Sequence, residues 1–249
     1  MLSVLAVVVA AVVATIGVVV VRAIADDPVA AQDELGPVLL VPGYGANMVA
    51  LDPLAEALRA QDRQVVTVRP PGNGTGDLRS QAEHLGDVAR QTVERTKAGS
   101  VDVVGFSAGG VVARLWVRDG DGRQLARRVL TIGSPHHGTD AAATAAELSG
   151  NCSRACDQLV PDSDLLRELN AGDETPGGPL WISIASTADQ TVTPTRTSGL
   201  DGALNLLVQD VCPDNAPIHG ALPHDPVVLA TLTTALGRGR PLAPTDVSC

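Results

Sequence analysis

The segment from residue 101 to residue 110, VDVVGFSAGG, constrains the fold of this chain more than any other. Residues 101–106 are a short apolar run rich in β-branched side chains, which is typical of a buried parallel strand. The pattern G-x-S-x-G ends the run, with the serine at position 107. A serine on a sharp strand-to-helix turn projects its hydroxyl from the sheet edge, and flanking glycines let strand and helix approach closely. We therefore predict that Ser107 is a nucleophile and that a helix over residues 108–117 aims its N-terminus at an oxyanion formed there.

Strand-like and helix-like patterns alternate along the rest of the chain. Besides residues 101–106, short buried strands are predicted over residues 38–41, 64–68, 127–132, 180–186 and 203–211. Helices are predicted to open at Asp52 as N-cap and at the Ser80–Glu83 capping box, and to cover residues 141–148, 163–170 and 226–236. The alternation predicts an α/β fold, with a mostly parallel central sheet and helices on both faces.

Length and charge narrow the class of protein. A chain of 249 residues with 45% hydrophobic residues suits one larger α/β domain. Its formal net charge is −10. A nucleic-acid partner would require a basic face, so no nucleic-acid partner is expected. The charge is compatible with a soluble exported enzyme.

The N-terminal residues 1–25 are predicted to be a leader. Residues 2–21 carry no charge, and Arg22 closes the run. One interpretation is a secretory signal peptide cleaved after Ala25, although no basic residue precedes the run and the run is long for a signal. The other is an uncleaved membrane anchor, since about 20 apolar residues span a bilayer. Arg22 by itself would place the following domain in the cytoplasm, but the cysteines argue for the outside.

Those cysteines number four and lie at Cys152, Cys156, Cys212 and Cys249. An even number behind a hydrophobic leader predicts two disulfides in an oxidising compartment. Three pairings are open, and proximity favours Cys152–Cys156, which leaves Cys212–Cys249. A zinc site is disfavoured, because the chain has only one C-x3-C and no second cysteine pair or histidine cluster. We expect a polar linker over residues 26–36 and the catalytic domain over residues 37–249.

Ser107 needs partners to act as a nucleophile. A serine hydroxyl is weakly nucleophilic at neutral pH, and it requires a histidine to accept its proton and an acid to orient that histidine. In one common arrangement the chain order is Ser, acid, His. Asp189 and His219 follow Ser107 in that order, and each lies just beyond a predicted strand, at the sheet edge where sites form. We predict Ser107, Asp189 and His219 as the catalytic residues.

Other histidines and acids are alternatives for the same roles. Two histidines, His136 and His137, precede the acid in the chain and are expected to shape a loop near the site. His84 lies in a predicted helix, and His224 lies beside a helix start. Of the competing acids, Asp201 lies in a turn and Asp210 lies in or at the end of a strand.

An oxyanion hole requires two backbone donors. The residue after the nucleophile, Ala108, supplies one. The loop after the first strand, residues 42–47 with the sequence PGYGAN, offers the other, and Tyr44 is the predicted donor. A plain strand-to-helix turn is the alternative interpretation of this loop.

Taken together, these motifs resemble the small bacterial triacylglycerol lipases of the α/β-hydrolase superfamily, of the compact type with little or no lid. The matching segments are VPGYG at 41–45, GFSAGG at 105–110, SPHHGT at 134–139, STADQTV at 186–192, LDGALN at 200–205 and IHG at 218–220. The resemblance implies the α/β-hydrolase fold, a Ser107–Asp189–His219 triad, and oxyanion donors at Tyr44 and Ala108. Pro42 replaces a histidine common in that family, and the longer segment 148–178 leaves room for a short cap.

The expected function is therefore carboxylic ester hydrolysis, with a lipase as the first choice and no cofactor. The expected partner is a lipid or other ester substrate, and the protein is expected to be a monomer. It is expected to be secreted, or to be anchored to the outer side of the cytoplasmic membrane through residues 2–21. The alternatives are a short-chain esterase, a polyester hydrolase, a thioesterase or an acyltransferase on the same site, or a non-catalytic lipid-binding protein of the same fold.

Overall fold

The computed structural model describes residues 29–150 and 152–249. The predicted leader, residues 1–25, lies outside the described residues. Within the described ranges, no helix has the length and apolar character needed to cross a membrane. Residues 29–36 fall in the predicted linker and form neither helix nor strand. Gln32 nevertheless forms two hydrogen bonds with Arg127: its side-chain amide donates to the Arg127 backbone carbonyl at 3.1 Å, and its backbone carbonyl accepts from the Arg127 guanidinium at 3.0 Å.

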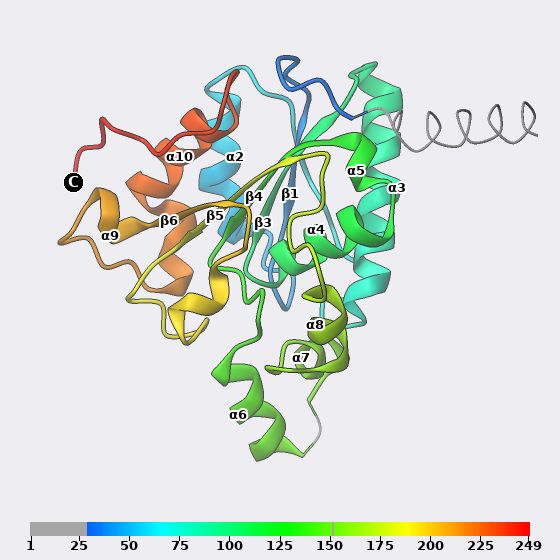
Figure 1. Cartoon of the computed structure of the whole chain (residues 1–249), viewed down its shortest axis with the longest axis vertical. Coiled ribbons are helices and arrows are strands. Elements are labelled where there is room, and N and C mark those ends of the chain that lie inside the picture. The colour runs from blue at the N-terminus through cyan, green and yellow to red at the C-terminus, as the bar shows by residue number, and fades with distance from the viewer. Residues whose placement is uncertain (1–28, 151) are drawn as a thin grey trace, which may run out of the picture.

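Six parallel strands of the described residues form one central sheet (Figure 1). The strands are β1 (Val38–Val41), β2 (Val65–Thr67), β3 (Val101–Phe106), β4 (Ala126–Ile132), β5 (Leu180–Ala185) and β6 (Leu204–Leu207). Their order across the sheet is β2-β1-β3-β4-β5-β6. All residues of β3 and β4 are buried, as expected for strands covered on both faces. The predicted α/β fold is confirmed.

Helices cover both faces of this sheet, and the strand residues alternate between two cores. On one face, Leu39, Val103 and Val129 pack with α3 (Leu78–Thr96) and α4 (Ala108–Asp119). On the other face, Leu40, Val104 and Leu130 pack with α2 (Asp52–Arg59) and α10 (Pro226–Ala235). Figure 1 shows α3, α4 and α5 (Gly122–Leu125) on one side of the sheet and α2 and α10 on the other. Successive side chains along a strand point to opposite faces of the sheet, so neighbouring residues enter different cores.

Two predicted helix starts are wrong in detail. A 3-10 turn, η1 (Val49–Leu51), runs directly into α2, so the N-cap is Leu51 rather than Asp52. Helix α3 begins before the predicted capping box at Ser80. The carboxylate of Asp77 accepts hydrogen bonds from the N–H groups of Arg79 (2.8 Å) and Ser80 (3.3 Å), and this cap starts the helix at Leu78.

The last strand is shorter than predicted. β6 ends at Leu207, and the four residues Val208–Val211 form the short helix α9. The Asp210 carboxylate accepts a hydrogen bond from the Leu207 N–H at 3.2 Å and so favours the turn. The apolar residues of this segment fit strand and helix equally well, and only the cap distinguishes the two.

Between β4 and β5 the chain forms α6 (Asp140–Ser149), α7 (Arg154–Gln158) and α8 (Asp164–Leu169). Figure 1 shows these three helices together at one end of the molecule, with α6 reaching farthest from the sheet. Helix α7 is tied to the segment before α3, since Ala155 N–H donates to the Thr75 carbonyl at 3.1 Å. The sequence predicts α6 and α8 but not the five-residue α7.

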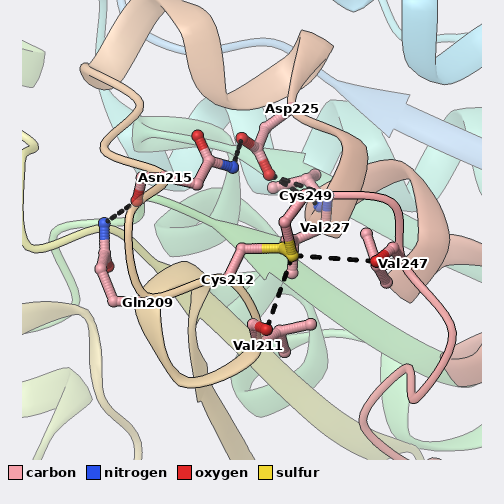
Figure 2. The surroundings of a disulfide bond; sticks show 9 residues. Gln209, Val211, Cys212, Asn215, Asp225, Val227, Val247 and Cys249 are labelled. Atoms are coloured by element: carbon pink, nitrogen blue, oxygen red, sulfur yellow. Dashed lines mark hydrogen bonds between the residues drawn. A yellow bond between two sulfur atoms is a disulfide. The ribbon is translucent and has the colours of Figure 1, made fainter.

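Both disulfides join cysteines in the pairs that proximity favours. Cys152–Cys156 closes the start of α7, and Cys212–Cys249 ties the last residue of the chain to the segment after α9. Figure 2 shows Asn215 beside the second disulfide, donating to the Asp225 carboxylate at 2.6 Å and accepting from Gln209 at 2.8 Å. These contacts hold the two ends of the segment that contains His219.

A buried charge cluster lies at the amino ends of the central strands. Asp102 of β3 is fully buried and pairs with Arg63 at 2.6 Å and with Arg127 at 2.5 Å. Arg127 also donates to the carbonyl of Leu236, just after α10. Burial lowers the pKa of the neighbouring Arg128 to about 10. The cluster stabilises the amino ends of the strands, and the predicted active site lies at their carboxyl ends.

Candidate active site

Ser107 occupies a sharp turn between β3 and α4. Its φ of 53° and ψ of −127° lie outside the conformations that non-glycine residues prefer. The turn is held by hydrogen bonds from Ser107 N–H to the Ile132 carbonyl (2.9 Å) and from Gly110 N–H to the Ser107 carbonyl (3.0 Å). A Cβ atom at Gly105 would stand 2.6 Å from Gly110 Cα, so strand and helix approach as closely as the motif requires. The turn has the shape of a nucleophile elbow.

His219 lies beside this serine. It begins the 3-10 helix η3 (His219–His224), and its Nε2 is 3.0 Å from Ser107 Oγ. Its Nδ1 is 2.7 Å from Asp189 Oδ2. The imidazole stacks on the ring of Phe106, with centroids 4.9 Å apart and an interplanar angle of 27°. When Nδ1 carries the proton and donates to Asp189, Nε2 is left as the acceptor for the Ser107 hydroxyl.

Asp189 lies in the loop that follows β5, and its side chain is only 2% exposed. Its Oδ1 accepts the N–H groups of Thr191 at 2.8 Å and Val192 at 2.9 Å. These two bonds orient the carboxylate so that Oδ2 faces the imidazole of His219. The carboxyl ends of β3 and β5 thus bring together the serine and the acid that lie 82 residues apart in the chain (189 − 107).

Two of the other histidines, His136 and His137, form hydrogen bonds away from Ser107. His136 is fully buried, and its Nε2 is 3.0 Å from Thr131 Oγ1. Burial, together with the charges of Arg114 and His137, lowers the pKa of His136 well below the usual value of 6.5. His137 places its Nε2 2.7 Å from Glu174 Oε1. Both residues therefore anchor the loop after β4, in agreement with the expectation that histidines preceding Asp189 in the chain shape a loop near the site.

Glu174 extends this anchor to a second turn. Its Oε2 accepts the backbone N–H of Asp201 at 2.8 Å. Burial by itself raises the pKa of Glu174, but the hydrogen bonds from Asp201 N–H and from His137 outweigh it and lower the pKa. Asp201 thus takes part through its backbone, and Asp210 caps α9. The carboxylate hydrogen-bonded to His219 is that of Asp189.

The loop over residues 42–47 passes directly against Ser107. A Cβ atom on Gly43 would stand 2.9 Å from Ser107 Cβ and 3.4 Å from Ser107 Oγ. Tyr44 is the next residue of that loop. On the other side of Ser107, Ala108 is the first residue of α4, at the positive end of the helix dipole. The two predicted oxyanion donors therefore lie in the segments that flank the serine.

A pocket of about 670 Å³ opens beside Ser107. Its walls come from the loop after β1, the loops after β4 and β5, helix α6 and the disulfide-closed start of α7. The lining is mainly apolar. The residues are Tyr44, Ser107, Pro135, Thr139, Ala141, Ala142, Ala145, Leu148, Cys152, Ser153, Cys156, Leu159, Thr191 and Val192. The arrangement places Ser107 at the wall of a mainly apolar cavity.

Sequence reasoning missed several of these residues. Phe106 is the only phenylalanine of the chain, and its position directly before Ser107 is the one sequence signal that places its ring near the site, where it stacks on His219. Ser153, whose hydroxyl lies 3.0 Å from that of Tyr44, gave no signal, because it meets Tyr44 only in the folded chain. Among the residues that the structure describes, no group of three or more His, Cys, Asp or Glu side chains is placed to hold a metal ion.

A parallel sheet with an elbow after β3 and helices on both faces defines the α/β-hydrolase fold. Residues 88–229, more than half of the chain, match the family described as lipase (class 2), and the chain belongs to that family. The predicted resemblance to lipases is thereby confirmed. A search of curated proteins finds no match to the sequence.

Two solved structures illustrate the shared fold. Lipase BlEst2 of Bacillus licheniformis, in its mature form, superposes with a TM-score of 0.68 at 16% identity, over 85% of this chain and 96% of that one. Lipase B of Aspergillus fumigatus gives 0.66 at 20% identity, over 83% of this chain and 54% of that one. This chain therefore spans about half the length of the Aspergillus enzyme. At such identities the likeness is one of fold.

Proposed function

We propose that this protein is a serine carboxylic ester hydrolase that cleaves acylglycerols or similar esters of long acyl chains. The observation that carries the proposal is the continuous hydrogen-bonded series from Ser107 Oγ through the His219 imidazole to the Asp189 carboxylate, at 3.0 Å and 2.7 Å, beside an apolar pocket. Membership of the class 2 lipase family agrees with it.

In the first half of the reaction, Ser107 Oγ attacks the ester carbonyl carbon while His219 Nε2 takes its proton. The carbonyl oxygen becomes an oxyanion, which accepts hydrogen bonds from the backbone N–H groups of Tyr44 and Ala108. Asp189 keeps the imidazole oriented and stabilises the imidazolium. The tetrahedral intermediate then collapses, the bond to the alcohol oxygen breaks, and the alcohol leaves with the proton from Nε2.

In the second half, water enters the position of the departed alcohol. His219 Nε2 takes one of its protons as the oxygen attacks the acyl carbon, and the same donors stabilise the second oxyanion. Collapse of this intermediate breaks the bond to Ser107 Oγ, which takes back the proton from His219. The carboxylic acid leaves, and Ser107 and His219 return to their starting protonation states.

The pocket supports the preference for long acyl chains. Each buried methylene group contributes about 0.8 kcal/mol to binding, so affinity rises with chain length until the cavity is filled. The side chains that α6 contributes to the pocket wall include three small ones, Ala141, Ala142 and Ala145. A volume of about 670 Å³ falls in the range of pockets that enclose whole ligands.

The proposed site of action is outside the cytoplasm. Two disulfides, Cys152–Cys156 and Cys212–Cys249, are typical of proteins that fold in an oxidising compartment.

The test is hydrolysis of p-nitrophenyl esters from acetate to palmitate by the purified protein and by Ser107→Ala. The proposal expects kcat/KM to rise with chain length and activity to vanish in the variant. Activity confined to acetate and butyrate would replace the lipase by a short-chain esterase. Equal activity of the wild type and Ser107→Ala would remove Ser107 as the nucleophile.

A further inference from the structure

The hydroxyl groups of Tyr44 and Ser153 lie 3.0 Å apart and join two segments separated by 109 residues of sequence. Tyr44 is the only tyrosine of the chain, and both residues line the pocket beside Ser107. Tyr44 as a residue is about half exposed, at 49%. An exposed neutral hydrogen bond adds little to the free energy of folding, so stability alone does not explain the pair.

Ser153 belongs to a segment that is held firmly. It is the N-cap of α7, where its hydroxyl accepts the Cys156 N–H at 3.4 Å, and the Cys152–Cys156 disulfide closes the same turn. The side chain of Gln158, at the end of α7, donates to the Asp77 carboxylate at 3.0 Å and accepts the Leu78 N–H at 2.8 Å.

The carboxylate of Asp77 adds a second tie to α7. It pairs with Arg154 at 3.2 Å while it caps α3. Burial alone would raise the pKa of Asp77, but its hydrogen bonds from the Arg79 N–H and from Arg154 outweigh that effect and lower the pKa. The segment from Cys152 to Gln158 is therefore docked on the start of α3, and Ser153 presents its hydroxyl from a fixed platform.

Tyr44 belongs to a loop with fewer constraints. Within residues 42–47 the structure has a turn closed by one bond, from Ala46 N–H to the Gly43 carbonyl at 3.1 Å. Gly45 and Ala46 both have positive φ, at 78° and 53°. Gly74 packs against Ala46 from outside the loop. On the pocket side, the Tyr44 hydroxyl ties the loop to α7.

We propose that Tyr44 and Ser153 are positioning residues for the oxyanion hole: their hydrogen bond holds the loop over residues 42–47 so that the Tyr44 N–H faces the oxyanion. The inference rests on the proposed function, in which that N–H is a donor. Donors stabilise an oxyanion only when they are already placed before the charge develops. A shift of about 1 Å in a catalytic group costs up to about a hundredfold in rate.

The test compares Tyr44→Phe, Ser153→Ala and the double variant with the full chain, on a p-nitrophenyl ester that the wild type hydrolyses. Tyr44→Phe removes only the hydroxyl. We expect kcat to fall about tenfold in each single variant, with KM within about twofold, because the hydroxyls act on the transition state rather than on ground-state binding. We expect the double variant to be no slower than the slower single variant, since both remove one interaction. Inactivation by an alkyl fluorophosphonate, which mimics the tetrahedral intermediate, should slow by the same factor.

Two controls separate positioning from folding. Ser153→Thr keeps both the cap and the hydroxyl, so it should retain kcat within about twofold. Thr96→Ala removes a helix-end hydroxyl at the other end of α3 from Asp77, where it donates to the Thr92 carbonyl at 2.7 Å, without touching Tyr44 or the segment from Cys152 to Gln158. It should leave kcat unchanged even if it lowers the melting temperature.

Three outcomes would overturn the inference. They are an unchanged kcat in Tyr44→Phe, strictly additive losses in the double variant, or a rise in KM with kcat intact, which would assign the hydroxyls to substrate binding. Failure of the proposed function looks different: the wild type would hydrolyse no ester, or Ser107→Ala would be as active as the wild type.

Discussion

Gly43 and Ser107 are in direct contact, so that a Cβ atom on Gly43 would stand 2.9 Å from the Cβ of the serine. Real Cβ atoms essentially never approach another atom so closely, and the neighbour here is the proposed nucleophile itself. The loop after β1 and the elbow after β3 are therefore fitted to each other through a glycine.

Replacing this glycine should damage the reaction more than the fold. In Gly43→Ala, the loop or Ser107 must move by a few tenths of an ångström, and we expect kcat to fall by about tenfold to a hundredfold. The measurement is kcat on a p-nitrophenyl ester, with circular dichroism to verify folding. Gly76→Ala is the matched control, because the same atom added there meets nothing within 4 Å. Full activity of Gly43→Ala would show that the loop has more freedom than the contact implies.

The acid of the site is tested by Asp189→Asn. An uncharged amide is a weaker acceptor for the Nδ1–H hydrogen bond and does not stabilise the imidazolium, so we expect kcat to fall by about 10² to 10⁴. Asp201→Asn serves as the control, because the Asp201 carboxylate lies in an exposed turn and only its backbone N–H bonds to Glu174. If Asp201→Asn were the inactive variant and Asp189→Asn the active one, the assignment of the acid would be wrong.

The cavity wall on α6 predicts a change of chain-length preference. Ala145→Phe places a ring in the pocket, so kcat/KM for palmitate esters should fall at least tenfold while that for butyrate esters changes by less than about threefold. The adjacent Thr144 is exposed and does not line the pocket. Thr144→Phe should therefore leave both values near those of the wild type. A uniform loss over all esters in Ala145→Phe would indicate that the acyl chain binds elsewhere.

Buried His136 predicts a loss of stability in mild acid. Its pKa is lowered by burial in the folded protein and is about 6.5 in the unfolded chain. The unfolded state therefore binds a proton that the folded state does not, and the free energy of unfolding falls as the pH drops below about 6.5, by up to about 1.4 kcal/mol per pH unit.

Urea unfolding at pH 8, 6 and 5 measures this dependence. His136→Phe should have a shallower slope below pH 6.5 than the wild type, even if it is less stable at pH 8 because it loses the bond to Thr131. His84, which lies half-buried on α3, provides the control variant His84→Phe. Parallel slopes in the wild type and His136→Phe would show that other groups govern the acid sensitivity.

Much of the fold was readable from the sequence, because the strands that matter are short, apolar and bounded by turns. Residues 38–41 were predicted to the residue, and 101–106 likewise, since both end at glycine-containing loops. The β6 segment was overextended, because Val208 to Val211 suits a strand as well as a helix and the Asp210 cap decides between them. Helix α7 was missed, because its five residues are too few for a periodic pattern.

The order of residue types along the chain was enough to predict the three central residues of the candidate site. The order of residue types after the strands predicts Ser107, Asp189 and His219, and the structure places their side chains in hydrogen-bond contact. The pocket could not be predicted from the sequence, because its walls on α6 and α7 come from the segment between β4 and β5, whose docking depends on pairs such as Gln158 and Leu78. The Tyr44–Ser153 pair belongs to the same class of contact.

The central claim is that Ser107 is the nucleophile activated by His219. Its most direct test is mass spectrometry of the full chain after reaction with an alkyl fluorophosphonate, which forms a stable adduct with an activated serine. We predict one adduct per chain, located on the peptide that contains Ser107, absent in Ser107→Ala and formed far more slowly in His219→Ala. Ester hydrolysis by a protein that takes up no label, or that carries the label on another residue, would contradict it.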